Sequence, residues 1–285
     1  MKNKVCLVTG ANTGIGLATA KALGEKGARV IVSCRTEDKA EETFEAIRRE
    51  FPHADLDYAL ADLSSQREIR EMAARLREKY AKLDVLINNA GSWFSTFSRT
   101  EDGFERQWAI NHLAPFLLTH CLLPLLTQSK DPRVITVSSD SHFHGKIHFD
   151  DVNLSQKYHG LRAYAQSKLA NVLFTREFDR RKNLPTLSSY AVQPGLVKTD
   201  IGLKHTLGWH GFAWKIRRLG GKSPEKGAET SIYLASSAEV KGVSGAYWDN
   251  CRQKNPGKNA QSLQDASQLW ELSQKMCGIG SYFNQ

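Results

Sequence analysis

A tyrosine and a lysine four residues apart, Tyr164 and Lys168, are well suited to acid–base chemistry. In a helix, residues i and i+4 lie on one face, close enough for the lysine ammonium to act on the phenol. The positive charge favours the tyrosinate and draws a pKa of roughly 10 toward neutrality. A tyrosine tuned in this way can give a proton to an alkoxide or take one from an alcohol. The spacing alone also fits a half-buried tyrosine beside a solvated lysine.

A glycine-rich stretch near the N-terminus, Thr9 to Gly16, could hold a dinucleotide. Its glycines lie between a predicted strand, 5–9, and a predicted helix, 17–26. Such a turn lets the backbone approach a pyrophosphate, and the helix N-terminus offers unpaired N–H groups. The spacing G-x-x-x-G-x-G is a variant of the usual dinucleotide motif, so the prediction depends on the strand before it and the helix after it.

Short β-branched runs alternate with helical patterns along the chain, which predicts βαβ units. The elements that must position the residues above are seven strands, expected at 5–9, 29–34, 56–61, 84–88, 133–138, 189–193 and 245–248, with helices between them. We therefore expect a single doubly wound α/β domain over 1–285, with a mostly parallel seven-stranded sheet and helices on both faces. No repeat or linker marks a domain boundary.

Three helix starts are predicted from caps. Ser65 with Glu68 forms the pattern of a capping box, and Ser223 before Pro224 is a typical cap. The Thr-Glu-Asp sequence at 100–102 predicts the cap and acidic first turn of a long helix that ends at Leu126. Pro115 and Pro124 must kink or divide that helix.

Composition excludes several classes of protein. Of 285 residues, 41% are hydrophobic and 24% charged, which is typical of a globular protein and not of a disordered one. The net charge of +9 comes from basic residues interleaved with acids, so we expect no nucleic acid partner. Five scattered cysteines indicate free thiols in a reducing compartment. Without a signal-peptide pattern, we expect a cytoplasmic protein, or one peripheral to a membrane.

Five motifs together resemble the short-chain dehydrogenase/reductase family, in its order and rough spacing and over the whole chain. They are the turn from Thr9 to Gly16, Asn88-Asn89-Ala90-Gly91, Ser138-Ser139, Tyr164 with Lys168, and Pro194-Gly195 followed by Thr199. Within the family the chain looks most like the retinol dehydrogenase group, through Asn111-His112-Leu113, the stretch 167–174 and the tail 245–251. Ala114-Pro115 departs from the group's usual Gly-His. The resemblance implies a Rossmann fold and an oxidoreductase.

The resemblance also implies roles for individual residues. Tyr164 would be the acid/base and Lys168 its electrostatic partner, which also bonds the nicotinamide ribose. Ser139 would hold the substrate oxygen, and Asn111 would support a water linked to Lys168. The cofactor would contact Gly10, Asn12, Thr13, Gly14, Ile15, Gly16, Arg35, Asp62, Leu63, Asn89, Ala90, Gly91, Tyr164, Lys168, Pro194, Gly195, Val197 and Thr199.

Some of these assignments have alternatives. Strand alternation turns Ser138 and Ser139 to opposite sides; the family register favours Ser139, and a hydroxyl that caps local backbone is the other interpretation. Asp62 would contact adenine or cap a helix. The end of the second strand carries Arg35 and no acid before Glu37, which favours NADP(H), with NAD(H) as the alternative and an exposed bystander arginine as the third interpretation.

Two further groups of residues bear on function. The histidines His142, His144 and His148 match no standard metal site, so we expect no metal and place them at the pocket edge or surface. The segment at about 200–223 mixes tryptophans with lysines and arginines, most densely over 203–222. It could cover a lipophilic substrate, contact a membrane surface, or pack as an ordinary helix.

The sequence thus predicts an NADP-preferring oxidoreductase that interconverts an alcohol and an aldehyde or ketone on a lipophilic small molecule, whether retinoid-like, steroid-like or a lipid aldehyde. The alternative is a non-catalytic dinucleotide-binding sensor or scaffold on the same fold. The sequence leaves the oligomeric state open, with a homodimer as one arrangement.

Overall fold

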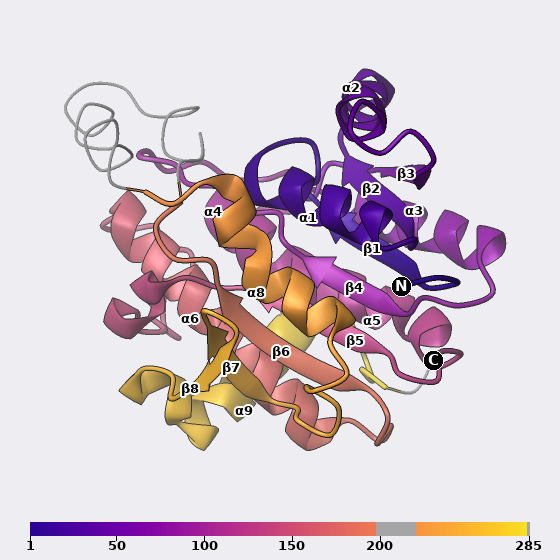
Figure 1. Ribbon diagram of the computed structural model, residues 1–285. Helices are drawn as coiled ribbons and strands as arrows, with labels where there is room; N and C mark the ends of the chain where they lie inside the picture. Colours follow the sequence, from indigo (N-terminus) through magenta and orange to yellow (C-terminus); the bar gives the residue numbers. More distant parts are fainter. Residues whose placement is uncertain (198–220, 284–285) are drawn as a thin grey trace.

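A single sheet runs through the computed structural model, which describes residues 1–197 and 221–283 (Figure 1). In the described residues it has eight strands in the order β3-β2-β1-β4-β5-β6-β7-β8, and only β8 is antiparallel to its neighbour. The strands are β1 Val5–Thr9, β2 Arg29–Cys34, β3 Asp55–Leu60, β4 Val85–Asn88, β5 Arg133–Val137, β6 Ser188–Gln193, β7 Ala246–Asp249 and β8 Arg252–Lys254. This is the Rossmann-type fold that we predicted, and the order reverses between β1 and β4, where such folds bind ligands.

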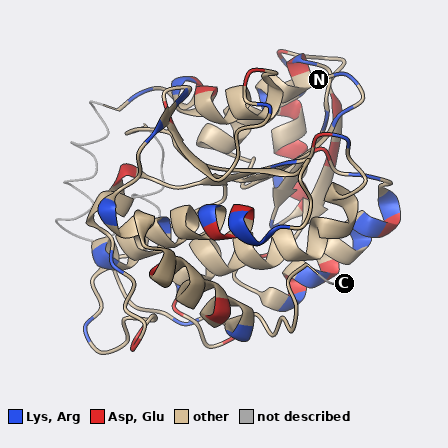
Figure 2. Ribbon diagram, turned by 90° about the horizontal axis from the view of Figure 1, so that it is seen from below, with Lys and Arg blue, Asp and Glu red and all other residues tan. Residues whose placement is uncertain are grey.

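Helices cover both faces of the sheet and create two apolar cores. One core lies under α3, α5, α6 and α9, and the other under α1, α2 and α8. The main helices are α1 Gly14–Glu25, α2 Glu37–Arg48, α3 Gln66–Lys79, α4 Arg106–Trp108, α5 Ala114–Leu126, α6 Gly160–Arg181, α8 Pro224–Ser236 and α9 Leu263–Met276. Because both faces are covered, the central strands are apolar without alternation, as in Val5–Thr9. On the outer helices, acidic and basic side chains are intermingled (Figure 2).

The prediction of seven strands was one too few. After β7 the chain turns through Asn250 and Cys251, which have φ values of +50° and +57°. Two successive positive φ values are typical of a type I′ turn, which joins antiparallel strands tightly. The strand that follows, β8, contains Arg-Gln-Lys and is exposed along its length. Its three polar residues lack the apolar signal of a strand, although charge suits an edge strand because it discourages pairing with other chains.

The long helix predicted from 100–102 starts later. It runs continuously over Arg106–Leu126, and Glu105 caps it by accepting hydrogen bonds from the amides of Gln107 and Trp108. Glu101 and Asp102 instead serve the N-terminus of α3: Ser65 Oγ donates to Glu101, and the Gln66 amide donates to Asp102 at 3.0 Å. The acids favour a helix N-terminus as expected, but it is that of another helix.

The same helix, Arg106–Leu126, is long and apolar enough to span a membrane. In the structure 83% of its apolar window is buried against the sheet and neighbouring helices. Its composition is therefore that of a core helix. Pro115 lies in the first turn of α5, and Pro124 lies inside α5.

The two other caps form, one of them differently from its pattern. Ser65 Oγ accepts from the Glu68 amide at 3.3 Å, but the Glu68 carboxylate accepts from the Asp62 amide instead of that of Ser65. Ser223 Oγ accepts from the Lys226 amide at 3.3 Å and starts α8.

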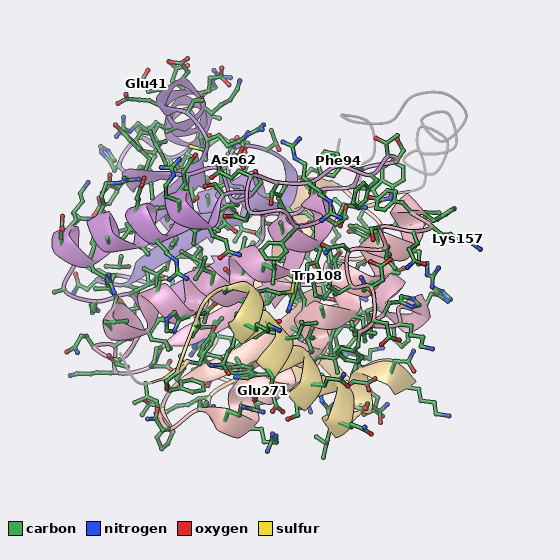
Figure 3. All side chains as sticks on the ribbon, turned by 180° about the vertical axis from the view of Figure 1, so that it is seen from behind. Glu41, Asp62, Phe94, Trp108, Lys157 and Glu271 are labelled. Carbon is green, nitrogen blue, oxygen red and sulfur yellow. The ribbon has the colours of Figure 1, made fainter. Side chains whose placement is uncertain are left out.

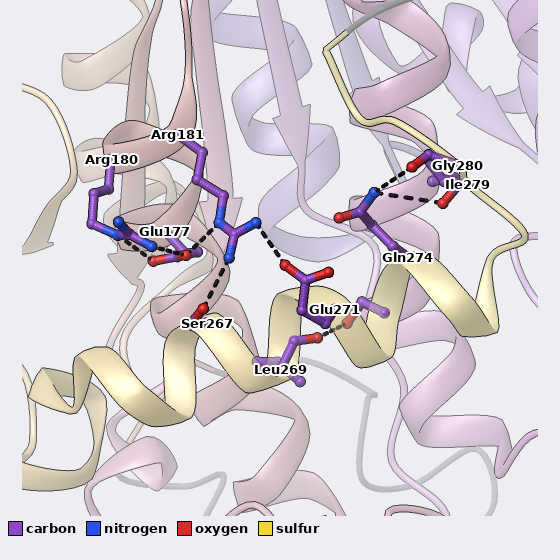
Figure 4. A network of polar contacts seen from close by, with 10 residues as sticks. Glu177, Arg180, Arg181, Ser267, Leu269, Glu271, Gln274, Ile279 and Gly280 are labelled. Carbon is purple, nitrogen blue, oxygen red and sulfur yellow. Dashed lines mark hydrogen bonds and ion pairs between the residues drawn. The ribbon is translucent and has the colours of Figure 1, made fainter.

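An ionic network joins the long helix α6 to the C-terminal helix α9 (Figure 4). The buried carboxylate of Glu177 accepts from Arg180 and Arg181 on its own helix. Arg181 also donates to Glu271 at 2.7 Å and to Ser267 at 2.9 Å, both on α9. The network therefore fixes α9 against the helix that carries Tyr164 and Lys168.

Candidate active site

A cavity of about 540 Å³ opens at the carboxyl ends of β1 to β4. Figure 3 shows Asp62 and Phe94, which both line it, along the same edge of the molecule. Twelve of the predicted cofactor residues line this cavity together: Gly10, Asn12, Thr13, Gly14, Ile15, Gly16, Arg35, Asp62, Leu63, Asn89, Ala90 and Gly91. They follow four different strands, so the fold brings together residues that are separated by up to about 80 positions in the sequence.

The first turn of the cavity requires its glycines. Gly10 and Gly14 have φ values of +62° and +56°, which side-chain-bearing residues rarely adopt. A Cβ on Gly16 would lie 2.3 Å from the Gly10 carbonyl oxygen and 2.5 Å from Asn89 Nδ2. Thr13, the first residue before α1, makes no side-chain cap. The helix amides therefore face the cavity without a side-chain acceptor, which fits a pyrophosphate.

The turn after β4 is fastened to the turn after β1. Asn89 Nδ2 donates to the Thr9 carbonyl at 2.7 Å, and the amides of Asn89 and Ala90 both donate to Thr9 Oγ1. Thr9 and Asn89 are thus used for fixing backbone, which holds the walls of the cavity at a set distance. Asn89 also lines the cavity, together with Ala90 and Gly91 of the same turn.

Two basic residues line the cavity after β2, and the sequence analysis found only one of them. Arg35 is exposed at the strand end, and Lys39 follows in the first turn of α2, where it pairs with Glu42 at 2.6 Å. The first acid, Glu37, does not line the cavity and accepts a hydrogen bond from the Tyr58 hydroxyl. Lys39 belongs to none of the motifs, so its place at the cavity was not predicted.

Asp62 lies just after β3 and does not cap the helix. Its Oδ1 accepts from the Ser64 amide at 2.8 Å, whereas Ser65 caps α3. The capping alternative for Asp62 was therefore wrong. The residue shapes the turn between β3 and α3, and this turn, with Leu63, forms one wall of the cavity.

Tyr164 and Lys168 lie on α6 as the spacing predicts. Lys168 Nζ is 5.5 Å from the centre of the Tyr164 ring and donates to the Val137 carbonyl oxygen at 3.0 Å. Lys168 is 2% exposed, and burial lowers the pKa of its ammonium to about 8. Neither residue lines the cavity described above. The half-buried tyrosine beside a solvated lysine is excluded, because this lysine is buried.

Asn111 lies in a π-helical segment, η1 Ala109–Leu113, between α4 and α5. Its Oδ1 accepts from the Ser92 amide at 2.7 Å, and its Nδ2 donates to the Ser92 carbonyl and to Ser167 Oγ, each at 3.0 Å. It therefore joins the loop after β4 to α6, next to Lys168. π-Helical segments often mark functional positions.

The two serines at the end of β5 differ in what they bond. Ser138 is buried, and its Oγ donates to the Lys168 carbonyl at 2.7 Å. Ser139 is partly exposed, and its Oγ accepts from the Ser141 amide at 3.2 Å and lies 3.0 Å from Asp140 Oδ1. The Ser138 hydroxyl is used inside the fold, whereas Ser139 both caps η2 Asp140–His144 and reaches the surface.

The segment after β6 returns to the first turn of the cavity. Gly195 has a φ of +78°, and the Leu196 carbonyl accepts from the Lys222 amide at 2.7 Å. A Cβ on Gly227 of α8 would meet both Val197, at 2.6 Å, and Ile15, at 3.3 Å, so these two predicted residues pack together against the same face of α8. Pro194, Gly195 and Val197 do not line the cavity. Thr199 and most of the 200–223 segment lie outside the described residues.

His142 is buried, so its predicted place at the pocket edge or surface was wrong. Its Nδ1 lies 2.7 Å from the Ser139 carbonyl oxygen, and its Nε2 accepts from the Gly257 amide at 2.9 Å. Burial lowers the pKa of His142, so the neutral ring donates through Nδ1. His148 accepts from Arg162 and is partly exposed. Over 1–197 and 221–283, no cluster of three potential metal ligands occurs.

Besides the twelve predicted residues, nine others line the cavity: Ser33, Cys34, Lys39, Ala61, Ser92, Phe94, Arg106, Ile110 and Pro224. The Arg106 guanidinium lies over the Phe94 ring, 5.1 Å from its centre. Arg106 and Ile110 were missed because the sequence analysis placed the start of their helix five residues too early.

Comparison with known proteins agrees with this architecture. Residues 4–206 match a model of the short chain dehydrogenase family. Human retinol dehydrogenase 14 is 40% identical over 98% of this chain and 88% of its own length, and human retinol dehydrogenase 13 is 42% identical over 97% and 85%. A solved protein from Mycobacterium paratuberculosis, described as putative and uncharacterized, superposes with a TM-score of 0.78 at 31% identity, covering 100% of this chain and 96% of that one. The chain is an NAD(P)-dependent oxidoreductase and belongs to the short-chain dehydrogenase/reductase family, with its resemblance strongest to the retinol dehydrogenases.

Proposed function

We propose that this protein is an NADP-preferring oxidoreductase that interconverts an alcohol and an aldehyde or ketone on a lipophilic small molecule. The observation on which the chemistry rests is the buried Lys168 ammonium 5.5 Å from the Tyr164 ring. The names of the relatives, retinol dehydrogenases 13 and 14, support a retinoid-like substrate. Steroid-like substrates and lipid aldehydes belong to the same proposal because they share the apolar body and the single reacting oxygen.

Tyr164 handles the proton of the reaction. A bound nicotinamide dinucleotide supplies the hydride to a carbonyl or takes it from an alcohol. In the reducing direction Tyr164 gives its phenolic proton to the oxygen of the substrate, and in the oxidising direction the tyrosinate takes that proton back. Lys168 lowers the cost of the tyrosinate because a cation close to an anion favours the charged form.

Ser139 and Asn111 support this step. Ser139 offers a hydroxyl at the surface end of β5, where it can donate to the substrate oxygen and hold it near Tyr164. Asn111 holds the loop after β4 against α6, and in this position it would support a water linked to Lys168. Ser138 has no part in substrate binding because its hydroxyl bonds the Lys168 carbonyl.

The residues at the end of β2 support the proposed cofactor preference. Arg35 and Lys39 place two positive charges at the cavity where the adenosine ribose would lie, and Glu37 is turned to Tyr58. Cations suit the additional phosphate of NADP, whereas NAD is usually held by an acid at this position. NAD(H) remains the weaker-binding alternative.

The alternative function is a non-catalytic dinucleotide sensor or scaffold. A sensor needs the glycine turn and the Asn89 contacts, but it has no need of a buried lysine, and burying one costs stability. The Lys168–Tyr164 pair therefore favours catalysis.

The deciding experiment measures NADPH oxidation with a panel of lipophilic aldehydes and ketones, including retinal. Tyr164→Phe should bind NADPH nearly as well as the natural protein and lose turnover by about 10²–10⁴-fold, the usual share of general acid catalysis. Turnover retained within tenfold would overturn the role of Tyr164. Tight NADPH binding without oxidation by any substrate in the panel would favour the sensor.

The cellular setting belongs to the proposal as well. A cytoplasmic location with peripheral membrane contact through 203–222 would bring the enzyme to lipophilic substrates, and residues 203–220 of that segment lie outside the described residues. Sedimentation with anionic vesicles tests the contact, and sedimentation equilibrium tests the homodimer.

A further inference from the structure

The carbonyl oxygen of Val137, at the end of β5, accepts two side-chain hydrogen bonds. Lys168 Nζ donates at 3.0 Å and Asn171 Nδ2 at 3.1 Å. The pairing of β5 with β4 ends at Thr136, opposite Asn88. The Val137 oxygen therefore has no partner on β4 and bonds side chains of α6. A carbonyl oxygen has two lone pairs. With Asn171 on one of them, a single direction is left for the lysine ammonium.

Asn171 is held in turn by a second buried pair. His112, on η1, is 0% exposed, and its Nε2 lies 2.9 Å from Ser273 Oγ of α9. The Asn171 side chain lies next to His112, and burial lowers the pKa of His112 to about 3. A neutral imidazole has one donor and one acceptor, so its two partners must be of opposite kinds.

Two buried atoms in this group, Asn171 Oδ1 and His112 Nδ1, have no hydrogen-bond partner in the described part of the chain. They satisfy each other if the Ser273 hydroxyl, which donates to the Leu269 carbonyl at 2.7 Å, turns its proton to His112 Nε2 instead, because His112 Nδ1–H can then donate to Asn171 Oδ1. A buried polar atom without a partner is destabilising, which favours this arrangement. The arrangement fixes the amide of Asn171, because Oδ1 must face His112 and Nδ2 must then face Val137.

We propose that Asn171 and His112 are positioning residues for the catalytic lysine. By occupying one lone pair of the Val137 oxygen they set the direction of the Lys168 ammonium, and through Ser273 they connect it to α9. The inference rests on the proposed function, since Lys168 matters there as the partner of Tyr164. It gives α9, which lies beyond the matched family region at 4–206, a part in the active site.

The test compares Asn171→Leu with Thr175→Val in NADPH-dependent turnover. Thr175 is a matched control: it is buried one turn further along α6, and its hydroxyl bonds only the Asn171 backbone carbonyl, at 2.9 Å. Asn171→Leu should lower kcat by about 10–100-fold, the scale expected when a catalytic group is misplaced, with a smaller change in KM for NADPH. Thr175→Val should leave kcat within about twofold, because it does not touch the lysine.

Two further measurements keep the proposal falsifiable. His112→Asn retains a donor where Nδ1 lies and should recover most of the kcat that His112→Leu loses; this pair decides the matter if Asn171→Leu does not fold. The ¹³Cε resonance of Lys168, assigned by its loss in Lys168→Arg, should move in Asn171→Leu and not in Thr175→Val. This resonance needs no turnover, so it tests the positioning even if Tyr164→Phe shows that the proposed function is wrong.

Equal kcat losses in Asn171→Leu and Thr175→Val would overturn the proposal, as would an unmoved Lys168 resonance. A His112→Asn variant no more active than His112→Leu would do the same. Each of these results would mean that Asn171, His112 and Ser273 only stabilise the core and do not position Lys168.

Discussion

The cofactor end and the catalytic end of this protein are built in different ways. The cavity is formed mainly by backbone groups: glycines at positive φ, helix amides without a side-chain acceptor, and loops joined by hydrogen bonds to Thr9. At Lys168 the site consists of buried side chains that bond one another across β5, η1 and α6. A site made of backbone groups can be open to solvent and still be rigid. A buried charge is stable only when each polar atom around it has a hydrogen-bond partner.

The buried lysine provides the largest effect that separates the two ends. Its pKa is about 8 in the folded protein against 10.5 for the ordinary group, so between these values the unfolded chain binds a proton that the folded protein has released. The free energy of unfolding should therefore rise with pH across this window, by about 3 kcal/mol relative to Lys168→Met. Below pH 8 both states are protonated, and the difference between the two proteins should be constant.

Urea unfolding of both proteins at pH 7, 8, 9 and 10 measures this difference. Tyrosines and cysteines also titrate here, but they are common to both proteins and cancel. Parallel pH dependences would show that the Lys168 ammonium is solvated, and would remove the contrast between the two ends.

Gly16 tests the backbone end. In Gly16→Ala the new Cβ would meet the Gly10 carbonyl oxygen at 2.3 Å, so the turn must open. We expect a loss of about 2 kcal/mol in NADPH binding, or about 30-fold in Kd, by overpacking at the pyrophosphate turn. Gly280→Ala is the control, because its Cβ would meet nothing within 4 Å. Fluorescence titration with NADPH measures both, and affinity within threefold of the natural protein would show that the turn yields easily.

The two ends also differ in how far they could be predicted from sequence. The glycine turn is a local requirement, so Gly10, Gly14 and Gly16 were identified from a strand, a turn and a helix that adjoin in the chain. Lys168 was identified from its spacing to Tyr164, but its burial was not. Local patterns do not show which side chains a fold will enclose.

The incorrect predictions have the same cause. His142 looked like a surface residue because its partner, the Gly257 amide, lies 115 positions away. Glu101 and Asp102 have the signature of a helix N-terminus, yet the helix that they serve is α3, which precedes them in the chain. In each case the hydrogen-bonding partner lies far away in the sequence. A local pattern cannot identify such a partner, because long-range contacts decide which donors and acceptors meet.

The cofactor preference gives a smaller effect, confined to the open end. Arg35→Glu should reduce kcat/KM with NADPH by about 10-fold or more and change it little with NADH, because the exposed charge acts on the additional phosphate alone. Arg49→Glu makes the same charge change at the far end of α2, outside the cavity, and serves as the control. Equal losses with both cofactors, or none, would show that Arg35 is a bystander.

The smallest effect concerns the network between α6 and α9, which stabilises the catalytic end from a distance. Glu177 is buried; burial raises its pKa, but hydrogen bonds from Arg180 and Arg181 outweigh this and hold the pKa below its usual range. Glu177→Gln keeps the shape and one acceptor, and Arg181 keeps Glu271. We expect a loss of about 1 kcal/mol in the free energy of unfolding, with kcat unchanged within about twofold.

The exposed pair Lys226–Glu229 supplies the comparison, since Glu229→Gln should change the free energy of unfolding by less than about 0.5 kcal/mol. Because Glu177 carries a lowered pKa, its contribution is present at neutral pH and disappears as the carboxylate is protonated in acid. Urea unfolding at pH 7 and pH 3 should therefore show a smaller difference between the natural protein and Glu177→Gln at the lower pH. A drop in kcat without a drop in stability would mean that α9 affects the position of Lys168 through this network as well as through Ser273. The ionic network at one end of α6 and the lysine at the other would then be coupled.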